Sequence, residues 1–167
     1  MAFDATTGGS NSNSYVTVAE ADAYFLDRQG SWDSNETHKQ YYLIKATDYL
    51  EATYQGKWKG VKANSTQALA WPRYGVIDAD GYPIDIDEIP LALKKATYEA
   101  AKLLSLNTEL LATVKPDKKR VKIDGAIEVE YKDGTSQDFY EQVHLHVRDL
   151  VQGFSGRGLT QSRLIRG

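Results

Sequence analysis

Residues 66–90, TQALAWPRYGVIDADGYPIDIDEIP, form the segment on which the rest of the fold depends. Pro72 has no backbone N–H and biases Trp71 toward extended geometry, which argues against a helix here. We therefore predict that residues 68–74 cross the molecule as an ordered, irregular segment. In such a crossing the indole of Trp71 is free to pack into the interior.

The same segment contains a tight turn. Asp78-Ala79-Asp80-Gly81 is typical of turns, because an aspartate side chain bonds to its own backbone and glycine accepts a positive φ. Apolar residues flank it, so we predict a small β-hairpin or Ω-like loop near residues 74–86. Pro90 then suits the first turn of a helix, where its missing N–H would have no partner. The residues that define this structural turn are Trp71, Pro72, Arg73 and Gly81.

Acidic residues around the turn raise the question of calcium binding; they are Asp78, Asp80, Asp85, Asp87 and Glu88. An EF-hand loop has glycine at its sixth position and glutamate at its twelfth. Counted from Asp78, Gly81 is the fourth residue, so the spacing does not fit. We interpret the cluster as a solvated acidic turn without a metal.

Composition favours a single soluble domain. The chain has 167 residues, 41% hydrophobic and 26% charged, which is enough for one core and short for two. No apolar run is long enough to span a membrane and no signal peptide is recognisable, so we expect a protein that is neither exported nor membrane-bound. The absence of cysteine excludes disulfides and thiolate chemistry. A formal net charge of −3 argues mildly against binding that neutralises many phosphates.

Four helices are predicted from apolar periodicity and from capping residues. The first begins with a capping box, Thr17 with Glu20, and ends near a glycine. The last begins at Asp138 and carries an apolar stripe. The predicted helices span about residues 17–30, 35–54, 90–106 and 138–153.

Residues 118–133 alternate between apolar and polar side chains, as strands do. The Asp124-Gly125 pair is a two-residue turn signal, so we predict a β-hairpin. A lone hairpin is marginal in water, and we expect it to pack on the helices or to pair with a neighbouring chain. The residues that would make this contact are Val121, Ile123, Ile127, Val129 and Tyr131. The predicted fold is therefore mainly α. It is a small bundle of about four helices with a turn or hairpin near residues 74–86, a β-hairpin near residues 118–133 and extended N- and C-terminal arms.

The two ends of the chain are predicted to be arms on one α-rich domain, residues 15–152. Residues 1–14 are rich in Gly, Ser, Thr and Asn and have little to bury, which predicts a flexible arm. Residues 153–167 hold three arginines and no acidic residue, and could reach about 50 Å when extended. A cationic arm with apolar anchors suits another protein's groove or acidic face. Its docking residues would be Phe154, Arg157, Leu159, Arg163, Leu164, Ile165 and Arg166.

No catalytic or cofactor-binding motif is present. The chain has no G-x-S-x-G, P-loop or G-x-G-x-x-G sequence. His144 and His146 are two residues apart, which places them on opposing sides of a helix and not around one metal. Carboxylates on the predicted helices, Asp22, Glu51 and Glu99, more often mark solvated faces. We therefore expect a protein that is not an enzyme and that holds no cofactor.

Single-stranded nucleic acid is the competing partner for the arginine arm. Gly156-Arg157-Gly158 beside Phe154 weakly matches an RGG segment. Three tryptophans and eleven tyrosines could stack on bases, but most fall on apolar stripes or beside turns, so core packing is the simpler interpretation. A second basic segment, residues 115–122, is interpreted as surface charge.

A family resemblance follows the chain in order. The segments that carry it are SYVTVAEADAYF, ATDYLEATYQGKWKG, QALAWPRYGVIDADGYPID and IPLALKKATYEAA. This series resembles tailed-bacteriophage neck proteins, the head-to-tail connectors or adaptors, members of which are often labelled DnaT-like single-stranded-DNA-binding proteins. The likeness is good over about residues 14–105 and holds in outline beyond, except at residues 107–120, which match nothing. The LAWPR turn is its most specific part.

The resemblance implies a structural protein of the virion neck, assembled in the bacterial host cytoplasm and repeated as a closed ring of about twelve copies beneath the portal. The C-terminal arms would dock to the portal protein, with many weak contacts acting together. Other partners would be neighbouring copies and the next tail component, while packaged DNA would pass without specific binding. The alternative function is single-stranded nucleic-acid binding in replication or recombination.

Overall fold

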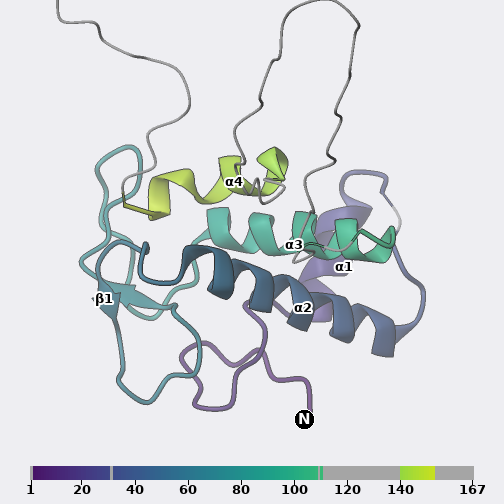
Figure 1. Cartoon of the computed structure of the whole chain (residues 1–167), viewed down its shortest axis with the longest axis horizontal. Helices are drawn as coiled ribbons and strands as arrows, with labels where there is room; N and C mark the ends of the chain where they lie inside the picture. The colour runs from purple at the N-terminus through teal and green to yellow at the C-terminus, as the bar shows by residue number, and fades with distance from the viewer. Residues whose placement is uncertain (1, 31, 109, 111–139, 153–167) are drawn as a thin grey trace, which may run out of the picture.

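Four α-helices and a two-stranded sheet make up the part of the chain that the computed structural model describes, residues 2–30, 32–108, 110 and 140–152. β1 and β2 are antiparallel, and α3 packs against both α2 and α4 (Figure 1). The mainly α fold is therefore as predicted. The elements in chain order are α1 (Val18–Leu26), α2 (Glu36–Tyr54), β1 (Val61–Lys62), β2 (Arg73–Tyr74), α3 (Leu91–Ser105), α4 (Glu141–Val147) and a 3₁₀ turn, η1 (Arg148–Leu150).

Side-chain caps begin the first two helices, and the cap of α1 is the capping box that the sequence predicts. At α1, Thr17 Oγ1 accepts the N–H of Glu20 (3.2 Å), and the Glu20 carboxylate accepts the N–H of Thr17 (2.8 Å). At α2, Asn35 Oδ1 accepts the N–H of Thr37 (2.9 Å). Each cap satisfies donors that a helix N-terminus leaves open. The third helix begins at Leu91, one residue later than predicted, and Pro90 is its N-cap residue and not part of its first turn.

The last helix is shorter than predicted. α4 begins at Glu141 and ends at Val147, and the chain then tightens into η1. Residue 138, its predicted cap, lies outside the described residues. The apolar stripe packs as expected, since Val143, Val147, Leu150 and Val151 are all buried.

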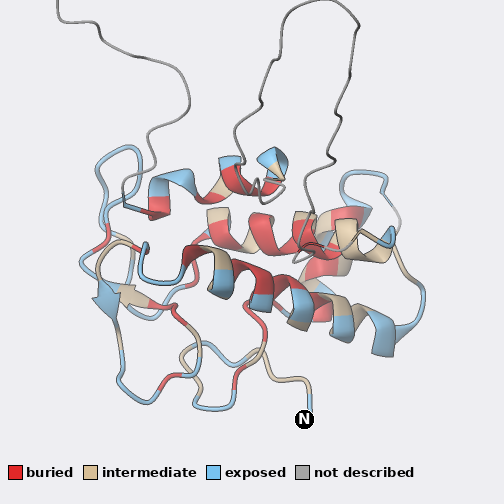
Figure 2. Ribbon diagram, in the orientation of Figure 1, coloured by how far each residue is buried: buried red, intermediate tan, exposed pale blue. Residues whose placement is uncertain are grey.

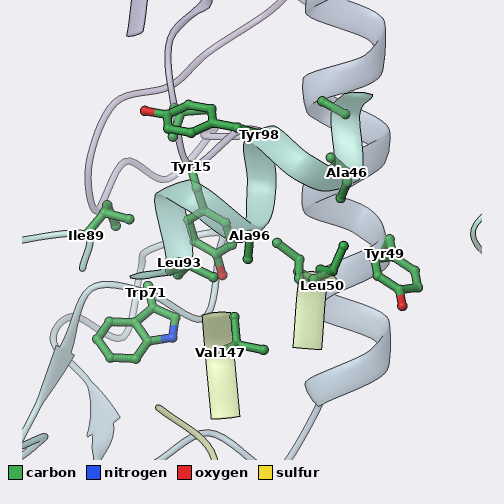
Figure 3. Packing of buried hydrophobic residues seen from close by; sticks show 14 of the residues in the cluster. Tyr15, Ala46, Tyr49, Leu50, Trp71, Ile89, Leu93, Ala96, Tyr98 and Val147 are labelled. Atoms are coloured by element: carbon green, nitrogen blue, oxygen red, sulfur yellow. The ribbon is translucent and has the colours of Figure 1, made fainter. Parts of the chain in front are cut away.

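The core lies between α2, α3 and α4 (Figure 2). Ala96 and Ala100 of α3 are completely buried, and their small side chains let the neighbouring helices approach closely. In Figure 3, Trp71 from the irregular crossing lies among core residues such as Leu93 of α3 and Val147 of α4. The crossing therefore contributes to the same core as the helices.

Residues 2–14 differ from the flexible arm that their composition predicts. The Asn13 N–H donates to the Asp4 carbonyl oxygen (2.8 Å), and the Asp4 N–H donates to Asn13 Oδ1 (2.9 Å). The Ala68 N–H donates to the Gly9 carbonyl oxygen (3.0 Å), which ties this loop to the crossing. The polar side chains satisfy the loop's own backbone, and composition alone does not show this.

The turn predicted near residues 74–86 is present. The Ile84 N–H donates to the Val76 carbonyl oxygen (3.0 Å). Gly81 has a φ of +92°, a conformation that residues with a side chain rarely adopt. The second predicted hairpin, near residues 118–133, lies outside the described part of the chain.

Candidate functional site

Arg73 holds the irregular crossing, residues 68–74, against the segment before β1. Its guanidinium donates three hydrogen bonds to main-chain carbonyl oxygens, from Nε to Lys59 (2.6 Å), from Nη2 to Gly60 (2.7 Å) and from Nη1 to Ala70 (3.0 Å). Partial burial lowers the pKa of Arg73. A planar guanidinium can satisfy several diverging oxygens at once. Arg73 therefore acts as a clamp within the fold.

Glu51 holds the crossing from the side of α2. Both of its carboxylate oxygens accept the Ala70 N–H, each at 3.1 Å, and one also accepts the phenolic O–H of Tyr15. Burial, followed by the charge of Glu51, raises the pKa of Tyr15 well above its usual value. Glu51 thus differs from the solvated helix carboxylate that we expected, because it joins two elements.

Two buried side chains complete the crossing from inside. Trp71 points inward as predicted, and its ring lies edge-on to Trp58, with 6.0 Å between the ring centroids. The Gln67 side-chain amide donates to the carbonyl oxygens of Leu69 (2.9 Å) and Pro72 (3.0 Å). Nothing in the sequence signals the burial of Gln67, since glutamine is usually exposed.

An open groove of about 770 Å³ runs beside the crossing. One wall is a face of α2 on which Asp48, Ala52 and Gln55 follow each other at helical spacing. The opposite wall comes from the crossing and from β1. The other residues that line the groove are Glu51, Gly56, Trp58, Gly60, Lys62, Ala68, Ala70, Arg73 and Gln152.

The last described residues end at this groove. The Gln152 N–H donates to the Lys57 carbonyl oxygen (2.7 Å), and the Lys59 N–H donates to the Leu150 carbonyl oxygen (3.0 Å). Gln152 also lines the groove. The predicted docking arm, residues 153–167, therefore leaves the described fold at the groove.

Exposed apolar side chains are frequent on the sheet and the turn that follows it. The cross-strand partners Val61 and Tyr74 are 61% and 63% exposed. Half of the ten exposed large hydrophobic residues in the described chain belong to this region, which we call the sheet-and-turn surface: Val61, Tyr74, Ile77, Tyr82 and Ile86. Adjacent exposed apolar side chains, such as the cross-strand pair Val61 and Tyr74, are features found at binding surfaces.

The acidic turn organises its own backbone. Asp78 Oδ1 accepts the N–H of Asp80 (3.0 Å) and the N–H of Tyr82 (2.8 Å), which is the turn chemistry that the sequence predicts. Within the described ranges, no three His, Asp or Glu side chains are grouped so that they could hold a metal ion.

Two further carboxylates belong to the scaffold, although we expected them on solvated faces. Asp22 accepts the indole N–H of Trp32 (2.8 Å) and a hydrogen bond from Lys39 Nζ (2.8 Å). Glu99 accepts the hydroxyl of Tyr24 (2.7 Å). Burial and the bond to Glu99 raise the pKa of Tyr24 to about 12. Asp22 joins α1 to the next helix, α2, whereas Glu99 joins α3 to α1, which is distant in sequence.

His144 is part of the core. Its Nδ1 is hydrogen-bonded to the hydroxyl of Tyr54, which links α4 to α2. Burial, with a smaller effect of the Lys57 charge, lowers the pKa of His144 to about 4. The imidazole is therefore neutral near pH 7. His146 is half-buried, so the two histidines differ in environment, as their spacing predicts.

Only part of the predicted site can be located. The turn residues Trp71, Pro72, Arg73 and Gly81 are described. The predicted contact residues of the hairpin (Val121, Ile123, Ile127, Val129 and Tyr131) and of the arm (Phe154, Arg157, Leu159, Arg163, Leu164, Ile165 and Arg166) lie outside the described residues. Among the described helices, none combines the length and the apolar character needed to cross a membrane.

Comparison with known families gives a match over the whole chain. A family model described as "Putative DnaT-like ssDNA binding protein" covers residues 1–167. The chain belongs to this family. Its description names a binding protein and no reaction. Comparisons with curated proteins and with solved structures find no match. The DnaT-like part of the predicted resemblance is therefore confirmed, and the connector role stays a prediction.

Proposed function

We propose that the chain is a structural, non-enzymatic subunit of a tailed-bacteriophage neck, an adaptor that forms a ring below the portal and docks to it through residues 153–167. The observation that carries the proposal is that the start of the arm and the sheet-and-turn surface lie at one end of the molecule. Figure 1 shows β1 and the end of α4 at the same end. A hydrogen bond from Lys59, two residues before β1, to Leu150 of η1 links these segments, so the described chain ends close to the sheet-and-turn surface.

The charges of the described surface support a protein partner. Asp78, Asp80, Asp85, Asp87 and Glu88 are all exposed on the turn. Carboxylates next to a phosphate backbone repel it, whereas nucleic-acid-binding surfaces are usually basic. The same negative charge, repeated around a ring, would keep packaged DNA from adhering to the channel wall.

Co-sedimentation with assembled portal rings tests the proposal. Full-length chain should pellet with the rings, and a chain that ends at Gln152 should not. Circular dichroism of the shortened chain shows whether its helices are retained. A matched variant, Arg157→Gln with Arg163→Gln and Arg166→Gln, keeps the arm at full length and should bind more weakly. Equal binding of the full-length and the shortened chain would refute docking through the arm.

The family description favours a second candidate function, the binding of single-stranded DNA. The three arginines of the arm could contact phosphates, and the exposed rings of Tyr74 and Tyr82 could stack on bases. Three phosphate contacts predict that the logarithm of the binding constant falls with the logarithm of the salt concentration with a slope of about −2. Fluorescence anisotropy with an oligo(dT) probe measures this slope, and no binding at low salt would exclude this function.

A further inference from the structure

The groove beside the crossing is open and its walls are small or polar. Ala52 and Ala68, on opposite walls, are both exposed and offer only a methyl group each. Trp58 also lines the groove, and only 5% of it is exposed. A volume of about 770 Å³ is within the range that accommodates several side chains or a small ligand. Room is therefore available for an apolar side chain next to Trp58.

The chain itself is the nearest occupant. Gln152 lines the groove and is fixed there by its hydrogen bond to Lys57. Asp48 of α2 and Gln55, the residue directly after this helix, are seven residues apart, so that wall is about 10 Å long at 1.5 Å per residue. Five extended residues after Gln152 span up to about 17 Å, which is enough to follow the whole wall. Tethering also gives these residues a high effective concentration at the groove.

The charges of the groove fit the first charged residue after Gln152, which is Arg157. The two cations of the groove are already engaged, Arg73 with three carbonyl oxygens and Lys62 with the Gln67 carbonyl oxygen (3.3 Å). In the described part of the chain no cation pairs with Asp48. Asp48 therefore stands on the groove wall as an anion that an arriving arginine can pair with.

We propose that residues 153–157 of the same chain occupy this groove, with Phe154 against Trp58 and Arg157 paired with Asp48. The arm is then divided into two parts. Phe154 and Arg157 fix its root and its direction, while Leu159, Arg163, Leu164, Ile165 and Arg166 remain for the partner. Fixing the root shortens the free part of the arm and lowers the entropy lost when it docks. Only the role given to the free part of the arm, binding of the partner, rests on the proposed function.

Limited trypsin digestion of the full-length protein tests this arrangement, because Arg157 and Arg163 are internal standards for each other. Each cleavage rate is divided by the rate at the same bond in a synthetic peptide of residues 153–167. We expect the relative rate at Arg157 to be at least about tenfold lower than at Arg163, since a seated segment must leave the groove before it is cut.

Three variants locate the protection. Ala52→Trp fills the groove and Asp48→Asn removes the charge, so both should make the two relative rates similar. Ala23→Trp places the same ring on an exposed position of α1 and should leave the protection unchanged. Circular dichroism confirms that each variant is folded, and Asp48→Asn alters only an exposed side chain.

Two results would overturn the proposal. Equal relative rates at Arg157 and Arg163 in the unmodified protein would show that the root is not held. Protection that increases with protein concentration would show that a second copy supplies the segment. Neither result bears on portal binding, because the digestion contains no portal and no DNA.

Discussion

Replacement of Arg73 by lysine should destabilise the protein while keeping its charge. The guanidinium reaches three carbonyl oxygens in different directions, on Lys59, Gly60 and Ala70. A lysine ammonium is a single point on a flexible stem and cannot reproduce the planar fork. We expect Arg73→Lys to keep at most one of the three hydrogen bonds.

The size of the effect follows from the bonds lost. A hydrogen bond from a charged donor contributes about 1.5 to 3 kcal/mol to stability. Two lost bonds give about 3 kcal/mol at the lower value, which is appropriate here because Arg73 and its acceptors are only partly buried. For a chain of this length such a loss lowers the melting temperature by about 6 to 12 °C.

Urea unfolding followed by circular dichroism measures the change, provided that the slope of the transition is unchanged. Arg148→Lys is the matched control, because Arg148 is exposed and its hydrogen bond to the carboxylate of Asp149 is long (3.4 Å). The control should differ from the unmodified protein by less than about 0.5 kcal/mol. If Arg73→Lys also stayed within that limit, the clamp would not stabilise the fold.

Three further outcomes are expected from unfolding measurements. The pKa of His144 is about 4 in the folded protein and about 6.5 when unfolded, so its contribution to the free energy of unfolding is complete above pH 6.5 and is lost as the pH falls toward 4. The loss between pH 7.5 and pH 5 is about 2 kcal/mol. His144→Gln should abolish this pH-dependent loss. Gly60→Ala should lower the free energy of unfolding by about 3 kcal/mol, because φ is +67° and the new Cβ would clash with the Tyr74 carbonyl oxygen. Gly81→Ala should lower it by only about 1 kcal/mol, because φ is +92° but the space around the residue is open. Equal losses would contradict the close approach at Gly60. Glu51→Gln should cost about 1 kcal/mol by weakening its bonds to Ala70 and Tyr15, and an unchanged stability would mean that these bonds contribute nothing.

Local signals in the sequence were sufficient to predict that the helices and the turn form. The capping box of Thr17 and Glu20 and the cap at Asn35 act within a few residues, so their geometry is encoded in the segment itself. Gly81 likewise identifies the turn through its own backbone conformation. The inward position of Trp71 follows from the proline beside it.

Contacts between residues that are far apart in the sequence could not be predicted from such local signals. Glu51 bonds to Ala70 and Tyr15, and His144 bonds to Tyr54, across long separations in sequence. Each side chain looks like an ordinary surface residue until the fold brings its partner close. The loop of residues 2–14 and the groove on α2 have the same origin, because both form only against the crossing.

We propose that this protein docks to a portal, and the binding of single-stranded DNA is the alternative function. Native mass spectrometry of portal rings mixed with the full-length chain tests it most directly. We expect the ring to gain multiples of 18.6 kDa up to a closed set of copies, while oligo(dT) at the same salt concentration gains none. A ring that gains no mass, together with an oligonucleotide that does bind the chain, would contradict the adaptor function and establish the DNA-binding one.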